Sequence, residues 1–356
     1  MKGRSSKPFE LGRIVKFVRV HPLVFAVVGI LLLLGLVAPV AAGKYLIDGV
    51  LDFFLIYLTL ALAYDILGGF AGYVNLGIVV FFGTGAYVFA ILFYTEHTNS
   101  IISLVISALV SGLLGFLVSF PMFRLRGFYF AVATLSLVPL GQYIVQAPSV
   151  NKWTNGVGGI NGIPGDYILA YYAIFFFALV TLAVTWLISR SNFGLALTTI
   201  REDEEIAESS GIDTMRVKRI AMVISAILAG ITGCLFAWSQ GTVLPDVVFS
   251  LYFAFIPVTF ALFGGTGTIL GPMIGTGVYS LLDYFLRSSS IQNSSFAFLS
   301  LYEQAIVGVF LIIVGLFAPD GIVGLYKRTL GRRLNLRTAR KLFGREIASK
   351  VTTDTY

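Results

Sequence analysis

Long stretches without a charged side chain restrict the folds open to this chain more than any other feature of its sequence. Several runs of about 18 or more residues contain no Asp, Glu, Lys or Arg, which is typical of membrane-spanning helices. Hydrophobic residues make up 57% of the 356 residues and charged residues only 12%. A membrane β-barrel would instead show short segments of alternating hydrophobicity. We therefore expect an all-α, polytopic membrane protein.

The apolar runs define ten candidate membrane spans. They are 23–40, 46–66, 73–94, 101–120, 127–147, 168–188, 217–239, 250–264, 267–286 and 301–318. Segments 73–94 and 250–286 are rich in glycine, so re-entrant or broken helices, and nine crossings or fewer, also fit the pattern. The expected organisation is a basic N-terminus at 1–22, a transmembrane domain at 23–318 and a basic tail at 319–356. A retained first helix is expected rather than a cleaved signal, because its apolar run is long and further spans follow.

The positions of Lys and Arg predict the orientation in the membrane. With ten crossings and both termini inside, the inner segments 1–22, 121–126, 189–219 and 319–356 hold 22 of the 25 basic residues. Basic residues concentrate in cytoplasmic loops of membrane proteins. We therefore expect a multi-pass protein of the plasma or inner membrane with both termini in the cytoplasm. The same rule accounts for the net charge of +7 without nucleic acid as a partner.

A short charged segment interrupts the apolar sequence inside the inner loop 189–216. Five of the chain's 18 acidic residues lie between 202 and 208. In a membrane protein, such a concentration of charge predicts a helix that docks on a soluble partner. A solvated loop whose charges only maintain solubility is the alternative.

Capping residues in the sequence predict that this segment is helical. Thr199 stands three residues before Glu202, as in a capping box. Gly211 is placed to end the helix, and Asp213 or the following threonine can cap the next span. These signals predict a helix over about residues 200–210.

Two glycine-rich breaks are each followed by the same short pattern. Gly68-Gly69-Phe70-Ala71-Gly72 precedes Gly83-Thr84-Gly85-Ala86-Tyr87, and Gly264-Gly265-Thr266-Gly267 precedes Gly275-Thr276-Gly277-Val278-Tyr279. Internal repeats are common in transporters. Chance recurrence in glycine-rich helices accounts for the match equally well.

Several classes of protein need residues that this sequence lacks. There is no GxxxxGK[ST] motif, so ATP cannot bind through a P-loop. Cys234 is the only cysteine, and His21 and His97 are far apart, which excludes a disulfide framework and a cysteine- or histidine-based metal site. Clustered His, Asp and Glu are also missing, so we expect no enzyme and no cofactor.

Six sequence blocks occur in a fixed order along residues 50–326. They are LGGFAGYVNLG at 67–77 with FGTGAY at 82–87, LRGFYFAVATL at 125–135, NGVGGINGIP at 155–164, SNFGLA at 191–196 with IRE, AE and GI up to 212, GGTGT and GP at 264–272, and PDGIVGL at 319–325. Together they resemble the LivM-type permeases of ABC importers for branched-chain amino acids. One departure is Asn75-Leu76-Gly77-Ile78, where that family often has Ser-Leu-Gly-His.

The resemblance implies the parts of an ATP-driven importer. A second, related permease subunit would pair with this chain, two ABC ATPase subunits would dock inside, and an extracellular solute-binding protein would deliver substrate. The implied substrates are branched-chain or other hydrophobic amino acids. Urea and short-chain amides are alternatives, because similar permeases import them.

The expected site residues fall into two groups. The candidates for coupling to the ATPases are Gly194, Arg201, Glu202, Asp203, Glu205, Ile206, Ala207 and Gly211. The candidates for the translocation pathway are Gly72, Asn75, Gly77, Thr84, Tyr87, Thr134, Gln142 and Gln304. Each polar side chain of the second group could equally satisfy a neighbouring helix by a hydrogen bond.

An ATP-independent carrier or facilitator for a small neutral solute is the main rival. Ion-coupled carriers need ionisable groups deep in the membrane, whereas Asp65, Asp283 and Glu303 lie near the ends of expected spans. A facilitator would have no use for an acidic loop helix.

Overall fold

The computed structural model describes residues 50–165, 167–287 and 321, and these residues form a bundle of α-helices. The long helices are α4 (Asp52–Gly68), α5 (Ile78–Ala90), α6 (Ser100–Met122), α7 (Phe128–Gln146), α9 (Tyr167–Arg190), α12 (Thr214–Gln240), α14 (Leu251–Gly264) and α15 (Leu270–Arg287). The short elements are η2 (Ile91–Thr95), α8 (Asn151–Thr154), η3 (Gly156–Gly158), β1 (Ile160–Asn161), α10 (Asn192–Glu202), α11 (Glu204–Ser209), β2 (Thr242–Val243) and α13 (Pro245–Val248).

The helical segments confirm an all-α, polytopic membrane protein. Six of them are long and apolar enough to cross a bilayer: Ile78–Thr95, Ser100–Met122, Phe128–Gln146, Ile168–Arg190, Thr214–Gln240 and Pro245–Gly264. Helix α4 and the apolar stretch Leu270–Leu282 are shorter. The expected spans 23–40 and 301–318 lie outside the described residues.

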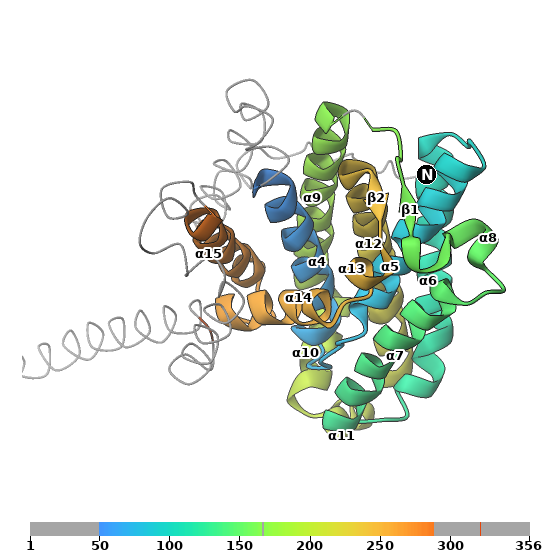
Figure 1. Ribbon diagram of the computed structural model, residues 1–356. Helices are drawn as coiled ribbons and strands as arrows, with labels where there is room; N and C mark the ends of the chain where they lie inside the picture. The colour runs from blue at the N-terminus through green and yellow to red at the C-terminus, as the bar shows by residue number, and fades with distance from the viewer. Residues whose placement is uncertain (1–49, 166, 288–320, 322–356) are drawn as a thin grey trace, which may run out of the picture.

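Helix α12 lies at the centre of the bundle and packs against α4, α5, α6 and α9 (Figure 1). Its contact with α5 is very close: a Cβ atom on Gly85 would lie 2.1 Å from the carbonyl oxygen of Gly230, and one on Gly233 would lie 1.9 Å from that of Phe82. Small residues allow such backbone contacts between membrane helices. The thiol of Cys234 is fully buried there and donates to the carbonyl oxygens of Gly85 and Gly230.

Helix α6 has small residues on its inner face and large apolar residues on its outer face. Buried on its inner side are Ser103, Ser107, Ser111, Gly112, Gly115 and Ser119. Exposed on its outer side are Ile101, Leu109, Leu113, Phe116 and Leu117. Because large apolar side chains gain nothing from water, the outer face suits contact with lipid.

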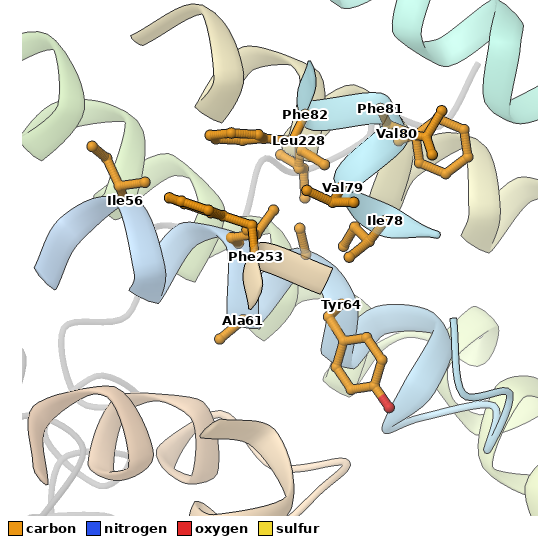
Figure 2. Close-up of a cluster of buried hydrophobic side chains, with 14 of the residues drawn as sticks. Ile56, Ala61, Tyr64, Ile78, Val79, Val80, Phe81, Phe82, Leu228 and Phe253 are labelled. Carbon is orange, nitrogen blue, oxygen red and sulfur yellow. The ribbon is translucent and has the colours of Figure 1, made fainter. Parts of the chain in front are cut away.

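Aromatic side chains fill the centre between α4, α5, α12 and α14. Figure 2 shows Phe82 and Phe253 near each other, and their stacked rings are 5.6 Å apart. Tyr57 packs edge-on against Phe260 from the neighbouring α14. Offset and edge-on pairs add to the energy of simple burial.

Both expected glycine breaks are present. Helix α5 begins only at Ile78, so residues 69–77 form a non-helical connection after α4. Residues 265–269 separate α14 from α15. Figure 1 shows α14 lying across the bundle, at a steep angle to α9 and α12.

One end of the bundle carries two short paired strands, the only strand pair of the described residues. Strand β1 pairs antiparallel with β2, with Ile160 opposite Val243. The pair joins the loop at 151–164 to the turn after α12. Gly159 has φ +62°, and a Cβ atom there would lie 2.3 Å from the carbonyl oxygen of Val243, so this glycine is required for the contact.

Candidate functional site

The charged segment after α9 folds as two short helices, and this corrects the single helix expected at 200–210. Helix α10 ends at Glu202, and Asp203 is extended, with φ −159° and ψ 117°. The Asp203 carboxylate accepts the backbone N–H groups of Glu205 and Ile206 at 2.9 and 3.1 Å, which caps α11. A carboxylate at this position satisfies orphan donors and favours the positive end of the helix dipole.

The expected capping box at Thr199 is therefore wrong. Thr199 lies inside α10, and its hydroxyl donates to the carbonyl oxygen of Leu195 at 2.9 Å. The cap of α10 is Ser191, whose hydroxyl accepts the N–H of Gly194 at 3.2 Å. Gly194 itself is buried, and a Cβ atom there would lie 2.1 Å from the carbonyl oxygen of Ile188. This candidate coupling residue thus forms the close turn between α9 and α10.

The end of α11 agrees with the sequence. Gly211 has φ +84°, and its N–H donates to the carbonyl oxygen of Glu208 at 2.9 Å. The N–H of Ile212 donates to the carbonyl oxygen of Ala207 at 3.1 Å, so the two bonds form a Schellman motif. Asp213 then caps α12 by accepting the N–H of Arg216 at 3.0 Å.

The outer side of α11, together with the residues just before it, exposes acidic side chains and one large apolar side chain to solvent. Ile206 is 59% exposed, and Glu202, Asp203 and Glu205 are exposed around it. Ala207, a candidate for coupling to the ATPases, is fully buried within this chain. Successive helical residues point about 100° apart, which turns Ala207 inward when Ile206 points outward.

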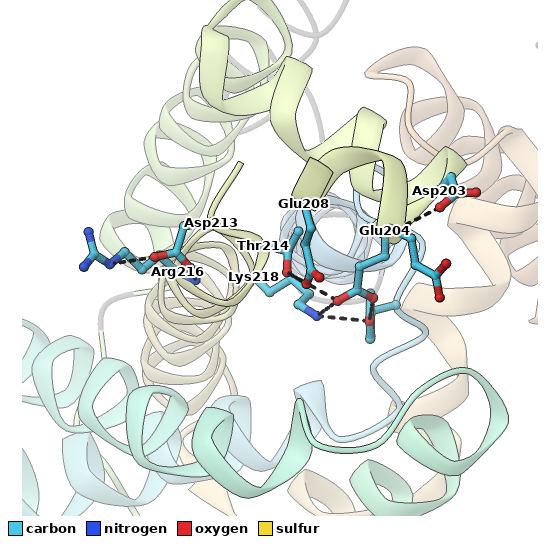
Figure 3. Close-up of polar contacts among 9 residues, drawn as sticks. Asp203, Glu204, Glu208, Asp213, Thr214, Arg216 and Lys218 are labelled. Carbon is cyan, nitrogen blue, oxygen red and sulfur yellow. Dashed lines mark hydrogen bonds and ion pairs between the residues drawn. The ribbon is translucent and has the colours of Figure 1, made fainter. Parts of the chain in front are cut away.

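A buried ion pair attaches α11 to α12 and to the first glycine break (Figure 3). The ammonium group of Lys218 donates to the carboxylate of Glu204 and, at 3.2 Å, to the hydroxyl of Tyr73. The Tyr73 hydroxyl in turn donates to Glu204 at 2.6 Å. Lys218 is 1% exposed and lies over the rings of Tyr73 and Phe123, 4.9 and 5.5 Å from their centroids. The first glycine break is thus joined to α11 and α12, which follow it by more than 130 residues.

The partners of Glu204 favour the ionised form of its carboxyl group. Burial alone would raise the pKa of Glu204, but hydrogen bonds from Lys218 and Tyr73 and the ammonium charge hold it below its usual value. Burial and the hydrogen bond to Glu204 raise the pKa of Tyr73. Nearby, the Thr214 hydroxyl donates to Glu208 at 2.8 Å, a second polar contact between α11 and α12.

Arg201 attaches the end of α10 to both glycine breaks. Its Nη1 atom donates to the carbonyl oxygen of Gly69 at 2.7 Å, and its Nη2 atom to the hydroxyl of Thr266 at 3.2 Å. Arg201 therefore makes contacts within this chain, although it was expected to act in coupling to the ATPases.

Three of the expected pathway residues come together where the first break packs on α7. The Thr134 hydroxyl accepts the N–H of Leu76 at 3.2 Å, and the Asn75 side chain accepts the N–H of Gly77 at 3.1 Å. A Cβ atom on Gly77 would lie 2.6 Å from the carbonyl oxygen of Thr134. Asn75 and Thr134 are buried, and their side-chain oxygens hold the backbone of the first break. Their place in a translocation pathway stays a prediction.

The other pathway candidates are spread over the bundle. Gly72 lies against the Arg201 side chain. Tyr87 donates to the carbonyl oxygen of Val243 at 3.4 Å, beside the strand pair. Gln142 donates to the carboxylate of Asp246 at 2.6 Å. Thr84 is half-buried on α5, and Gln304 lies outside the described residues.

The folded core that carries these contacts matches one family of proteins. The family model described as "Branched-chain amino acid transport system / permease component" matches residues 46–315. The chain belongs to this family.

Individual members of the family align with most of the chain. The permease protein LivM of the high-affinity branched-chain amino acid transport system of Escherichia coli K12 is 26% identical over 335 residues, which is 84% of this chain and 75% of the relative. LivM of Salmonella typhimurium is 27% identical over 311 residues, 78% of this chain and 69% of the relative. The permease protein LivH of E. coli K12 is 32% identical over 146 residues, 41% of this chain and 44% of the relative. No solved structure matches.

Sequence reasoning missed Glu204 and Lys218. The signal that could have found them was the position of Lys218, a charge just inside the expected span 217–239, because a charge at membrane depth needs a partner. Within the described residues, no three His, Cys, Asp or Glu side chains gather in a way that could hold a metal ion.

Proposed function

We propose that this chain is a membrane-spanning permease subunit of an ATP-driven importer for branched-chain or other hydrophobic amino acids. The observation that supports it most is the α10–α11 segment, which is exposed and acidic on its outside and joined by polar contacts to α12 and both glycine breaks. A helix pair of this kind can transmit the movement of a soluble partner to the membrane helices as a rigid-body displacement. Family membership supports the class of substrate.

The proposed complex contains several other subunits. Since the sequence has no P-loop, ATP hydrolysis is assigned to two separate ABC ATPase subunits and not to this chain. Similarity to both LivM and LivH of one organism, each named as a permease protein of the branched-chain system, supports a second permease subunit. An extracellular solute-binding protein would deliver the substrate. The distribution of Lys and Arg supports cytoplasmic termini and a cytoplasmic α10–α11 segment.

Ile206 is the proposed centre of the contact with the ATPase. Burying its exposed side chain in an apolar groove would contribute on the order of 1 kcal/mol or more. Each exposed ion pair made by Glu202, Asp203 or Glu205 would add only about 0–1 kcal/mol, because solvent and salt screen it. The acidic residues would therefore select a basic groove, and Ile206 would provide most of the affinity.

The variant Ile206→Asp tests this assignment. Tagged complex is purified from membranes, and the amount of bound ATPase and the ATP-dependent uptake of labelled leucine into proteoliposomes are measured. We expect both to fall at least about tenfold, the equivalent of about 1.4 kcal/mol. The control is Asn192→Asp, which adds the same charge at the exposed start of α10. Undiminished ATPase binding and uptake in Ile206→Asp would refute the proposal.

The same uptake assay separates the candidate substrates. Unlabelled leucine, isoleucine or valine should compete with labelled leucine, whereas urea and acetamide should not. Competition by urea or acetamide alone would move the assignment to the related urea and amide permeases.

One observation favours an ion-coupled carrier as the second candidate. Asp65 in the last turn of α4 is fully buried, and one of its carboxylate oxygens has no hydrogen-bond partner. Buried carboxylates of this kind occur on ion pathways of carriers. Uptake by the isolated chain that follows a proton or sodium gradient without ATP would support this alternative.

A further inference from the structure

The two glycine breaks, which lie about 200 positions apart in sequence, are in direct contact. The Asp65 carboxylate accepts the N–H of Gly267 at 3.0 Å. A Cβ atom on Gly69 would lie 2.5 Å from the same nitrogen, so the two backbones touch. Each break follows a helix that ends in glycine, α4 or α14, and precedes the helix that carries the Gly-Thr-Gly-x-Tyr pattern. The two segments therefore resemble each other both in sequence and in their place between two helices.

Arg201, which belongs to the α10–α11 segment, binds both glycine breaks where they meet. Its two terminal nitrogens have acceptors in different breaks, Gly69 in the first and Thr266 in the second. The guanidinium group is a planar fork with fixed donor directions, so it can bridge two acceptors where an ammonium group would act as a single point charge. Arg201 as a whole is exposed to solvent. It also lies in the last turn of α10, where the helix dipole favours a cation.

The glycines beside Arg201 are needed for this arrangement. Gly72 and Gly267 have φ +76° and +71°, which disfavours any residue with a side chain. A Cβ atom on Gly72 would lie 2.9 Å from Cγ of Arg201, and one on Gly267 would lie 2.7 Å from Nη1. Both breaks are therefore shaped to admit the arginine side chain.

We infer that Arg201 is the positioning residue through which movement of α10 and α11 reaches both glycine breaks together. This inference rests on the proposed function, since it needs a partner that moves the segment. In many transporters, broken helices at membrane depth form the substrate and ion sites around which the parts of the protein move. A displacement of α10 pulls on one acceptor in each break, so the starts of α5 and α15 move as a unit. Arg201 thus acts inside the chain and does not bind the ATPase.

The test compares Arg201→Lys and Arg201→Ala with Arg216→Ala in the complete complex, reconstituted in proteoliposomes. Arg216 is a matched control because it lies in the adjoining helix and pairs only with the exposed Asp213 among the described residues. The measured quantity is substrate imported per ATP hydrolysed. We expect all variants to retain the ATPase subunits and to hydrolyse ATP within about twofold of wild type. Import per ATP should fall at least about tenfold in Arg201→Ala, less in Arg201→Lys, and not in Arg216→Ala.

A second variant keeps the test decisive if Arg201→Ala folds poorly. Thr266→Ala removes only the acceptor of Nη2 and leaves the arginine in place. It should lower import per ATP in the wild-type background and have no further effect in Arg201→Lys, because residues that act as one unit are not additive. Additive effects, or unchanged import per ATP in Arg201→Ala, would overturn the inference.

The failure of this inference differs from failure of the proposed function. Loss of the ATPase subunits from both Arg201 variants would make Arg201 a docking residue and overturn the inference. A wild-type complex without ATPases, or one that imports without ATP, would instead refute the proposed function.

Discussion

Replacing Lys218 by methionine tests whether the ion pair with Glu204 holds α11 against the membrane-spanning body. Methionine has a similar length and fills the space between the rings of Tyr73 and Phe123, so the change removes mainly the charge. Glu204 is then left without its cation but keeps the hydrogen bond from Tyr73.

The expected cost follows from the burial of the two partners. Breaking a fully buried pair by removing one partner costs about 3–5 kcal/mol. The Glu204 side chain is 15% exposed, so water compensates part of the loss, and we take about 2–3 kcal/mol. Because 1.4 kcal/mol corresponds to a factor of ten, the equilibrium for local opening of α11 should shift by about 30- to 150-fold.

Hydrogen–deuterium exchange of residues 203–212 measures this opening. The N–H groups of Ala207, Ser210 and Gly211 all donate to carbonyl oxygens within the segment, so they report its unfolding. The control is Arg216→Met, which breaks an ion pair with side-chain exposures of 80% and 53% and should cost only about 0–1 kcal/mol. Equal exchange in the two variants, or no increase in Lys218→Met, would refute the reasoning.

Two further predictions concern helix packing and pH. Gly85→Ala should separate α5 from α12 and destabilise the protein by about 1–3 kcal/mol, seen as a lower Tm in detergent. Gly277→Ala, at the same position of the second Gly-Thr-Gly pattern but with open space around it, should leave the Tm unchanged; equal shifts would contradict the packing argument. Because the pKa of Glu204 is lowered in the folded state, its contribution to stability should be complete above the ordinary value of 4.5 and lost as the pH falls through the lowered pKa. Amide exchange of α11, corrected for its intrinsic pH dependence, should therefore stay constant from neutral pH down to that range, and loss of protection near neutral pH would contradict the assignment.

Features set by short-range rules were predictable from the sequence. The bilayer imposes a minimum length on apolar helices, so uncharged runs located α6, α7, α9 and α12 closely. The end of α11 at Gly211 and the cap at Asp213 depend on only a few neighbouring residues, and both were expected. Glycine clusters also marked both breaks, because backbone freedom is a local property.

Features that depend on distant partners were not predictable. The expected helix at 200–210 ignored Asp203, whose carboxylate competes with the continuing helix by capping a new one. The cluster of Glu204, Lys218 and Tyr73 joins segments up to 145 residues apart, and no local pattern indicates that they meet. The same holds for Asn75 and Thr134, whose side-chain oxygens accept backbone N–H groups of the first break.

The buried thiol of Cys234 has a practical consequence for observing the proposed movement. It is the only thiol in the chain, and it lies fully buried against the backbone of α5. Thiol reagents need an accessible thiolate, so this group should stay unlabelled in the folded protein. An Asn192→Cys variant would then carry a single fluorophore at the exposed start of α10 without removal of the native cysteine. Anisotropy of that dye would follow the docking and release of the segment during each cycle of ATP hydrolysis.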